Sequence, residues 1–241
     1  MPWYKEWFGE EYLEMYSHRD ASEAEEHVDF VERHLQGPRP RAVLDLACGA
    51  GRHTAVLRRR GYRTLGVDLS MTLLARMRVQ GLPRVAGDMR RLPFAAESFD
   101  WVLNFFTSFG YFEGERENFR VLEEVVRVLT PGGWFLIDLM NPGPVLANLK
   151  PRDGQEVDGR RTEIERWYDA GRQRMNKRIV VSAPGEPPRT FLESVRLYQP
   201  KEVTVGLRWA GFEVAGVFGN FLGDPYERDS ERLILLCTKP A

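Results

Sequence analysis

The chain has 241 residues, of which 34 are basic and 35 acidic, so its formal net charge at pH 7 is −1 and gives no support to a polyanionic partner. The length suits one α/β domain with an elaboration, and no apolar run reaches the roughly 18 residues that a membrane-spanning helix needs. Cys48 and Cys237 are too few for a disulfide scaffold or a metal site. The first residues lack the pattern of a signal peptide, so we expect a reduced, cytoplasmic protein without a metal.

Residues 1–36 predict two helices ahead of the first strand. Tyr12 and Tyr16 share one face of a helix over Glu10–His18, and a second helix runs from a cap at Asp20 to Gly37. Two interpretations stay open for this region: packing on the sheet edge, or a helical cover over a ligand. The aromatic residues near the start favour the cover; they are Trp3, Tyr4, Trp7 and Phe8.

The next stretch, 43–53, begins as a short apolar run typical of a buried parallel strand, predicted over Ala42–Ala47. It then breaks at Gly49 and Gly51 into a helix over Thr54–Arg60. Glycines at such a junction let a ligand approach the backbone, and the helix N-terminus offers free N–H groups. A dinucleotide turn would carry a third glycine where Thr54 stands. Asp45, inside the strand, favours a positively charged ligand over a pyrophosphate.

Two further strand ends carry acidic residues. A strand over Arg63–Asp68 ends in Asp68, which can accept hydrogen bonds from both ribose hydroxyls of an adenosine group. Ser70 is the better cap for the helix over Met71–Gln80, which leaves Asp68 and its neighbour Leu69 for the ligand. A short strand over Arg84–Gly87 is followed by Asp88 and Met89.

A fourth strand, over Phe99–Phe106, ends in an aromatic segment. Ligands of parallel sheets lie beyond the carboxyl ends of the strands, which makes Asn104, Phe105, Phe109 and Tyr111 candidates for contacts with a ligand. Aromatic faces suit a sulfonium or a cationic amine. An aromatic core plug explains any one of these rings about as well.

The remaining chain alternates once more and then changes pattern. An amphipathic helix over Glu113–Leu129 precedes a strand over Trp134–Leu139. Residues 150–199 then look like antiparallel strands joined by short turns. The last elements are a helix from Pro200 to Gly211 and two further strands. The expected strands after residue 150 are Ile164–Asp169, Met175–Ser182, Arg189–Gln199, Phe212–Phe218 and Arg232–Thr238.

Several of these stretches resemble class I S-adenosylmethionine-dependent methyltransferases. The resemblance rests on residues 43–53, on Gly87–Phe94 and on the run from Val128 to Asp138; it covers 43–140 closely and 200–241 less closely. It implies a Rossmann-like, mostly parallel sheet of seven strands with helices on both faces. It also implies an antiparallel β insert after the fifth strand and an N-terminal helical cover. We therefore expect a cover over 1–36, a cofactor-binding domain over 37–149 and 200–241, and an insert over 150–199.

The resemblance implies S-adenosylmethionine as the cofactor and methyl transfer by in-line displacement. The expected cofactor-binding residues are Tyr16, Arg19, Asp45, Ala47, Gly49, Gly51, Asp68, Leu69, Asp88, Met89, Asn104 and Phe105. The expected substrate-binding residues are Phe109, Tyr111, Arg166 and Tyr168, with the insert acting as a substrate lid or a dimer surface. His18 and then Tyr198 are the candidates for a general base. His53 is expected at the first helix, and His27 and His34 at the surface.

The predicted activity is methylation of a small-molecule acceptor by a monomer or homodimer. Three alternatives remain from the sequence. An NAD(P)-dependent oxidoreductase conflicts with the missing third glycine and with the Asp88-Met89 segment. An RNA methyltransferase would need a basic face that only the arginines of the insert can supply, and nucleic acid is therefore disfavoured as a partner. The third alternative is a cofactor-binding module without catalysis.

Overall fold

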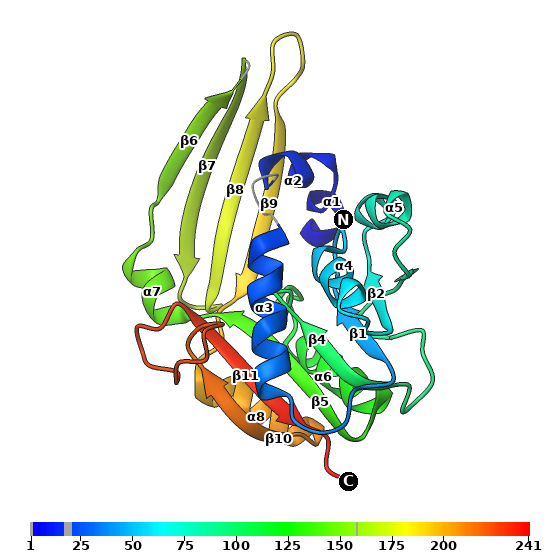
Figure 1. Ribbon diagram of the computed structural model, residues 1–241. Coiled ribbons are helices and arrows are strands. Elements are labelled where there is room, and N and C mark those ends of the chain that lie inside the picture. Colours follow the sequence, from blue (N-terminus) through cyan, green and yellow to red (C-terminus); the bar gives the residue numbers. More distant parts are fainter. Residues whose placement is uncertain (1, 17–20, 158) are drawn as a thin grey trace.

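A central sheet of seven strands organises the computed structural model, which describes residues 2–16, 21–157 and 159–241. Its strand order is β10-β11-β5-β4-β1-β2-β3 (Figure 1). Only β11 runs antiparallel to its neighbours, so the predicted fold class is confirmed. The strands are β1 (Val43–Leu46), β2 (Thr64–Asp68), β3 (Arg84–Ala86), β4 (Phe99–Asn104), β5 (Leu129–Met140), β10 (Glu213–Phe218) and β11 (Arg232–Thr238).

Both faces of this sheet are buried, which explains the continuous apolar runs in the sequence. All four residues of β1 are buried. Along β11, Leu233 and Leu235 belong to one hydrophobic core cluster, whereas Ile234 and Leu236 belong to another. Successive side chains of β11 point to opposite faces of the sheet, so one strand contributes to the hydrophobic core on each face.

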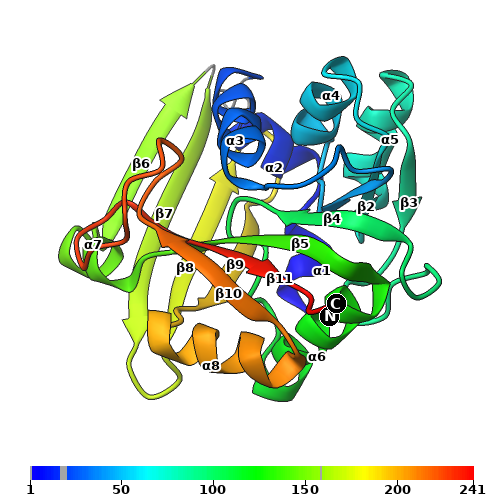
Figure 2. The ribbon, with the colours of Figure 1, turned by 60° about the horizontal axis from the view of Figure 1, so that its bottom comes forward.

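Helices cover each face (Figure 2). One face carries α3 (Ala21–His34), α4 (Arg52–Arg59) and α5 (Met71–Val79), and the other carries α6 (Glu115–Val128) and α8 (Pro200–Ala210). The hydroxyl of Ser70 accepts a hydrogen bond from the amide of Leu73 and caps α5 as predicted. Gly211 ends α8 with φ +105°, a conformation that glycine adopts without strain. Asp20, the predicted cap of the second helix, lies outside the described residues.

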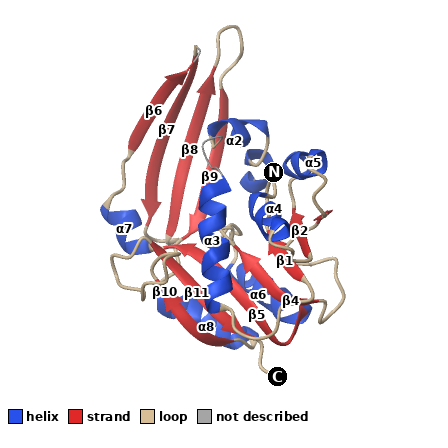
Figure 3. Cartoon of the chain, in the orientation of Figure 1, coloured by secondary structure: helices blue, strands red, loops and turns tan. Residues whose placement is uncertain are grey.

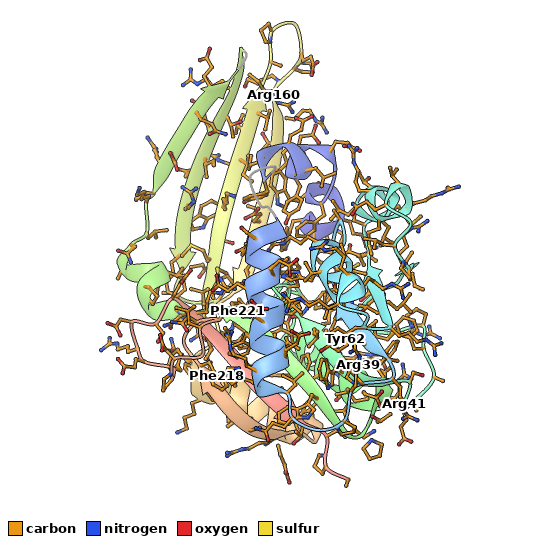
Figure 4. The ribbon with its side chains drawn as sticks, in the orientation of Figure 1. Arg39, Arg41, Tyr62, Arg160, Phe218 and Phe221 are labelled. Carbon is orange, nitrogen blue, oxygen red and sulfur yellow. The ribbon has the colours of Figure 1, made fainter. Side chains whose placement is uncertain are left out.

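The contacts of α3 show why its sequence alternates apolar and charged residues. Phe30 of α3 packs edge-to-face on Phe218 and Phe221, with ring centroids 5.1 and 5.4 Å apart; Figure 4 labels both partners. The outer face of α3 carries Glu25, whose carboxylate pairs with Arg59 of α4 and with Arg60, the C-cap of α4. These arginines stabilise the packing of two helices.

The insert forms a second, antiparallel sheet in the order β6-β7-β8-β9, which stands beside α1 and α2 (Figure 3). Four strands are present where the sequence predicted three. The additional strand, β6, is a polar edge strand, and an edge strand needs no alternating apolar face. The strands are β6 (Arg152–Val157), β7 (Arg160–Asp169), β8 (Arg174–Ser182) and β9 (Arg189–Arg196).

Three short helices complete the chain: α1 (Trp3–Trp7), α2 (Glu10–Met15) and α7 (Pro142–Ala147). The sequence did not predict α1 or α7, because five or six residues show too little periodicity. Tertiary packing holds α1: Trp7, 1% exposed, packs against Ile179, Val181 and Phe191 of the insert. The hydroxyl of Ser70 donates to the carbonyl of Phe8 at 2.6 Å. The N-terminal helices therefore lie between the insert and the central sheet.

Candidate functional site

A cavity of about 490 Å³ lies beyond the carboxyl ends of β1, β2 and β4. The loops after these strands form one side, and α1, α2 and β9 form the other. Its size is typical of a small-molecule or cofactor site. Predicted site residues that line it are Tyr16, Asp45, Ala47, Gly49, Asp68, Leu69, Asp88, Met89, Phe105 and Tyr111.

The turn after β1 has the backbone conformations that the glycines predict. Gly49 and Gly51 have φ of +56° and +84°, in the left-handed region. Ala47 also has a positive φ, +58°. For a residue with a Cβ, this conformation raises the free energy of the folded state. A Cβ at Gly51 would lie 2.7 Å from Cγ of Met77. Gly51 does not line the cavity; it lets α4 and α5 pack closely.

Asp68 joins this turn to the end of β2. Its Oδ2 accepts the Gly49 amide and its Oδ1 accepts the Ser70 amide, both at 2.8 Å. Burial raises the pKa of Asp68, and these hydrogen bonds oppose the increase. A carboxylate held from two sides has lone pairs left for the hydroxyls of a ribose. The predicted ribose contact is therefore geometrically available.

Asp45 is a second carboxylate on the cavity wall. It is 1% exposed, and burial raises its pKa to about 6 although the Thr54 hydroxyl donates to its Oδ2 at 2.6 Å. A buried carboxylate without a cation in contact is costly. A ligand with an ammonium and a sulfonium would offset that cost, whereas a pyrophosphate would increase it. The buried carboxylate of Asp45 thus fits S-adenosylmethionine better than a dinucleotide.

Asp88 is oriented by its neighbour Arg90. The guanidinium donates to Oδ2 of Asp88 through Nη2 at 2.6 Å and to Oδ1 through Nε at 3.0 Å. Burial alone would raise the pKa of Asp88, but these hydrogen bonds outweigh it and hold the pKa below its ordinary value. An ionised carboxylate beside Met89 suits the amino group of an adenine, which agrees with the expectation that Asp88 binds the cofactor.

A second part of the cavity lining, the aromatic end, consists mainly of aromatic side chains. The ring centroid of Tyr111 lies 4.9 Å from that of Trp3 and 5.7 Å from that of Phe8. The ring centroids of Phe8 and Tyr12 are 5.0 Å apart. Glu193 of β9 brings a carboxylate to the same wall. Its Oε1 accepts the Tyr16 hydroxyl at 3.3 Å and lies 3.5 Å from Nζ of Lys177. This end combines ring faces with one acidic group.

Between the two ends lies a segment with an unusual backbone. Phe106 and Thr107, which follow β4, both have positive φ, +61° and +57°. Such conformations cost about 1–3 kcal/mol each for residues with side chains. Asp138 and Arg232 hold them: the carboxylate of Asp138 accepts the Phe106 amide at 2.7 Å, and Arg232 donates to the Thr107 hydroxyl at 2.8 Å.

Two histidines, one on the cavity wall and one behind it, correct one expectation. His27, predicted at the surface, is 4% exposed; its Nδ1 lies 2.9 Å from Nε2 of His53, and its ring stacks on Phe221 at 3.7 Å. Burial, with Arg52 and Arg232 nearby, lowers the pKa of His27 to about 3. His53 lines the cavity and stacks on Phe105 at 4.1 Å. The pair is neutral at physiological pH and supports the wall. Packing of α3 on α4 brings the two rings together, and sequence alone could not show it.

Tyr198, a candidate base, does not lie on the cavity. It is 2% exposed and packs on Phe109 in the core, with ring centroids 5.3 Å apart. Its hydroxyl donates to Glu115 at 2.8 Å, and burial raises its pKa far above the ordinary value. Neither Tyr198 nor Phe109, a predicted substrate contact, is placed to touch a ligand there.

Three more predicted residues also lie away from the cavity. Asn104 donates to the carbonyl of Leu46 at 2.9 Å and so ties β4 to β1. Arg166 and Tyr168 lie on β7; Arg166 pairs with Asp153 at 3.7 Å, and neither lines the cavity. Their strand is separated from the cavity by β8 and β9. The remaining predicted residues, His18 and Arg19, lie outside the described residues.

Two residues that line the cavity were not predicted from the sequence: Glu193 and Arg232. Glu193 is an acidic residue between Phe191 and Val195 on one face of β9, and that break in an apolar face was the available signal. Arg232 is the first residue of an antiparallel strand, so it lies at the carboxyl edge of the parallel neighbours. Only the strand order reveals that position.

Among the described residues, no group of three or more His, Cys, Asp or Glu side chains is arranged to hold a metal ion. A search of the same residues finds no helix with the length and hydropathy to cross a membrane. Both cysteines are free and buried.

Comparisons with known proteins agree with this geometry. A family model described as a methyltransferase domain matches residues 44–137. The chain is 29% identical over 217 residues to the cypemycin N-terminal methyltransferase of a Streptomyces species, covering 81% of this chain and 82% of the relative. It is 29% identical over 204 residues to the dTDP-3-amino-3,4,6-trideoxy-alpha-D-glucopyranose N,N-dimethyltransferase of Streptomyces venezuelae, covering 80% and 84%.

The solved structures show the same fold. An amino pentose methyltransferase from Micromonospora echinaspora, with S-adenosylmethionine bound, superposes with a TM-score of 0.68 at 22% identity. The superposition covers 95% of this chain and 96% of the other. This likeness shows the fold, and the matched family model agrees with the resemblance to methyltransferases.

Proposed function

This chain is an S-adenosylmethionine-dependent methyltransferase, and we propose that it methylates an amino group of a small-molecule acceptor. The aromatic end of the cavity carries the proposal, because Trp3, Phe8, Tyr12 and Tyr111 meet Glu193 there. Ring faces attract cations, and a carboxylate accepts strong hydrogen bonds from an ammonium. An amine that enters from water as an ammonium would find both partners.

The names of the relatives support the same acceptor chemistry. One of the two methylates the N-terminus of cypemycin, and the other dimethylates an amino sugar attached to a nucleotide. Both are N-methyltransferases that match over about four fifths of this chain.

The chemistry asks mainly for alignment. S-adenosylmethionine supplies an electrophilic methyl group when bound. Fixing two reactants in line is worth about 7–11 kcal/mol, against about 2.7–5.5 kcal/mol for a general base that accelerates a reaction 10²–10⁴-fold. In the proposed arrangement Asp45, Asp68 and Asp88 bind the cofactor, and Glu193 orients the acceptor nitrogen. As part of this proposal, His18 is the base that takes the proton that the ammonium must lose before its nitrogen attacks the methyl group, and S-adenosylhomocysteine leaves.

An RNA acceptor has less support, because several arginines of the insert are already engaged. Arg160 pairs with Glu14 at 2.5 Å, Arg178 with Glu165 at 2.5 Å, and Arg189 with Glu11. Arg174 is 7% exposed and donates to the carbonyls of three residues from 110 to 112. These four arginines are therefore poorly available for contacts with a phosphate backbone. The proposal includes a cytoplasmic location, which the two free thiols support.

Turnover of a matched acceptor panel tests the proposal. The panel pairs amines with hydroxyl counterparts: nucleotide-linked amino sugars, peptides with free N-termini and alkylamines, each beside its hydroxyl analogue. Release of S-adenosylhomocysteine is measured. We expect turnover with at least one amine and none with its hydroxyl partner. Turnover restricted to hydroxyls, or none at all with a protein that binds the cofactor, contradicts the proposal.

Glu193→Gln tests the aromatic end, which is the acceptor end in this proposal. The substitution keeps the shape and removes the charge, so we expect kcat/KM for the amine to fall roughly 10- to 100-fold, the range for one hydrogen bond to a charged group. Affinity for S-adenosylmethionine should stay unchanged. Glu165→Gln on β7, outside the cavity, is the control and should behave as wild type. If both variants lower kcat/KM equally, Glu193 has no specific role in binding the acceptor.

A further inference from the structure

The end of β4 carries two consecutive residues in a conformation that side chains disfavour. Phe106 and Thr107 have φ of +61° and +57°, and both line the cavity. Neither is a glycine, so surrounding contacts must maintain the conformation. Strained backbone of this kind is concentrated at functional sites. The contacts that hold Phe106 and Thr107 are therefore candidates for a functional role.

Asp138, at the end of β5, makes two of these contacts. Its Oδ2 accepts the amide of Phe106 at 2.7 Å, and its backbone carbonyl accepts the amide of Thr107 at 3.0 Å. Asp138 is fully buried. A buried carboxylate needs a cation or several donors to remain charged.

Arg232, the first residue of β11, supplies that cation. Its Nε donates to Oδ1 of Asp138 at 2.8 Å, and Nη2 lies 2.7 Å from the same oxygen. Nη2 also donates to the hydroxyl of Thr107 at 2.8 Å. The guanidinium thus holds the carboxylate and the strained segment together.

The segment also reaches the cofactor turn. The ring of Phe106 lies under the guanidinium of Arg52, 5.2 Å from ring centroid to Cζ, and Arg232 lies 5.8 Å from the same centroid. Arg52 is the first residue of α4, directly after Gly51. A shift of Phe106 would therefore move the cavity wall between the cofactor turn and the aromatic end.

We propose that Arg232 and Asp138 form a latch that holds Phe106 and Thr107 in place and so aligns the acceptor with the methyl group. Arg232 is a positioning residue in this arrangement. The latch acts through backbone geometry. Its loss should lower kcat and leave affinity for the cofactor unchanged, because Asp45, Asp68 and Asp88 do not contact it.

Arg232→Gln combined with a glycine substitution tests the latch. A misplaced wall costs up to about 100-fold in rate, so we expect Arg232→Gln to lower kcat roughly 10- to 100-fold. Glycine adopts the left-handed conformation without a Cβ penalty. Arg232→Gln with Thr107→Gly should therefore recover most of the lost kcat, whereas Arg232→Gln with Ser108→Gly should not, because Ser108 is not among the residues with positive φ.

Arg41→Gln is the matched control. Arg41, labelled in Figure 4, also pairs with an aspartate that accepts backbone amides, Asp100 at 3.3 Å, but this pair lies at the amino ends of β1 and β4. This variant should keep wild-type turnover. Amide exchange at Phe106 and Thr107 should accelerate in Arg232→Gln and stay slow in Arg41→Gln. Exchange that does not change, or a double variant no faster than Arg232→Gln alone, overturns the latch.

The turnover measurement rests on the proposed function and uses the best amine of the panel. A loss confined to acceptor KM would make Arg232 a ligand-binding residue and overturn the latch. If wild-type protein methylates no amine, the proposed function fails. Amide exchange, together with cofactor titration of the same variants, then decides the latch by itself.

Discussion

The two ends of the cavity are built in different ways. The cofactor end comes from three short stretches within residues 45–89, each following a neighbouring parallel strand. The acceptor end brings together Trp3, Tyr111 and Glu193, which are far apart in the sequence. Local turns therefore define where the cofactor binds, whereas long-range packing shapes the acceptor end. The difference suggests that the two ends respond separately to substitution.

The largest expected effect concerns the packing that holds the acceptor end. Trp7→Ala removes a buried ring between α1 and the insert, and such truncations typically cost about 3–5 kcal/mol of unfolding free energy. We expect a clear decrease in thermal stability and loss of amine turnover, while the cofactor still binds to the folded fraction. Calorimetry and cofactor titration measure the two effects.

Trp209→Ala is the control for Trp7, because Trp209 is 89% exposed on α8. It should leave stability nearly unchanged. If Trp7→Ala abolishes cofactor binding in folded protein, the two ends are coupled and the comparison fails.

The next effect concerns the cofactor end. Asp68→Ala removes a charged acceptor and should weaken S-adenosylmethionine binding by about 1.5–3 kcal/mol, roughly 10- to 150-fold. A smaller loss of stability should accompany it, because Asp68 also accepts the amides of Gly49 and Ser70. Asp68→Asn, which keeps one accepting oxygen, should bind with intermediate affinity in a calorimetric titration. Asp153→Ala, on the insert, should bind like wild type. Unchanged affinity in Asp68→Ala would contradict this cofactor placement.

The smallest effect is a pH dependence with opposite signs for stability and binding. Burial raises the pKa of Asp45 from an ordinary 3.8 to about 6, so the folded state binds a proton more readily than the unfolded state. Asp45 then makes the free protein more stable as pH falls from about 6 towards 4. A positively charged cofactor needs the ionised form, so its affinity should fall roughly ten-fold for each pH unit below about 6.

Titrations of S-adenosylmethionine between pH 5 and pH 7, a window about the raised pKa of Asp45, check the sign. Asp45→Asn should remove the Asp45-dependent part of this change and lower affinity at neutral pH. If the affinity of the wild-type protein for S-adenosylmethionine rises towards acid pH, Asp45 does not bind the cofactor in its ionised form.

The sequence determined the central sheet and the cofactor end because their signals are local. A buried strand, a glycine turn and an acidic strand end lie within a few residues of each other, so Gly49, Asp68 and Asp88 could be placed from the chain alone. The mostly parallel sheet of seven strands followed from the resemblance, and the structure confirmed it.

Only the tertiary structure decided the acceptor end. Tyr198 and Phe109 had suitable chemistry, but their side chains pack into the core. Glu193 and Arg232 carried weak local signals, yet β9 and β11 bring them to the cavity. The reason is physical: which face of a strand meets a cavity depends on the partner that packs against it, and that partner lies far away in the sequence.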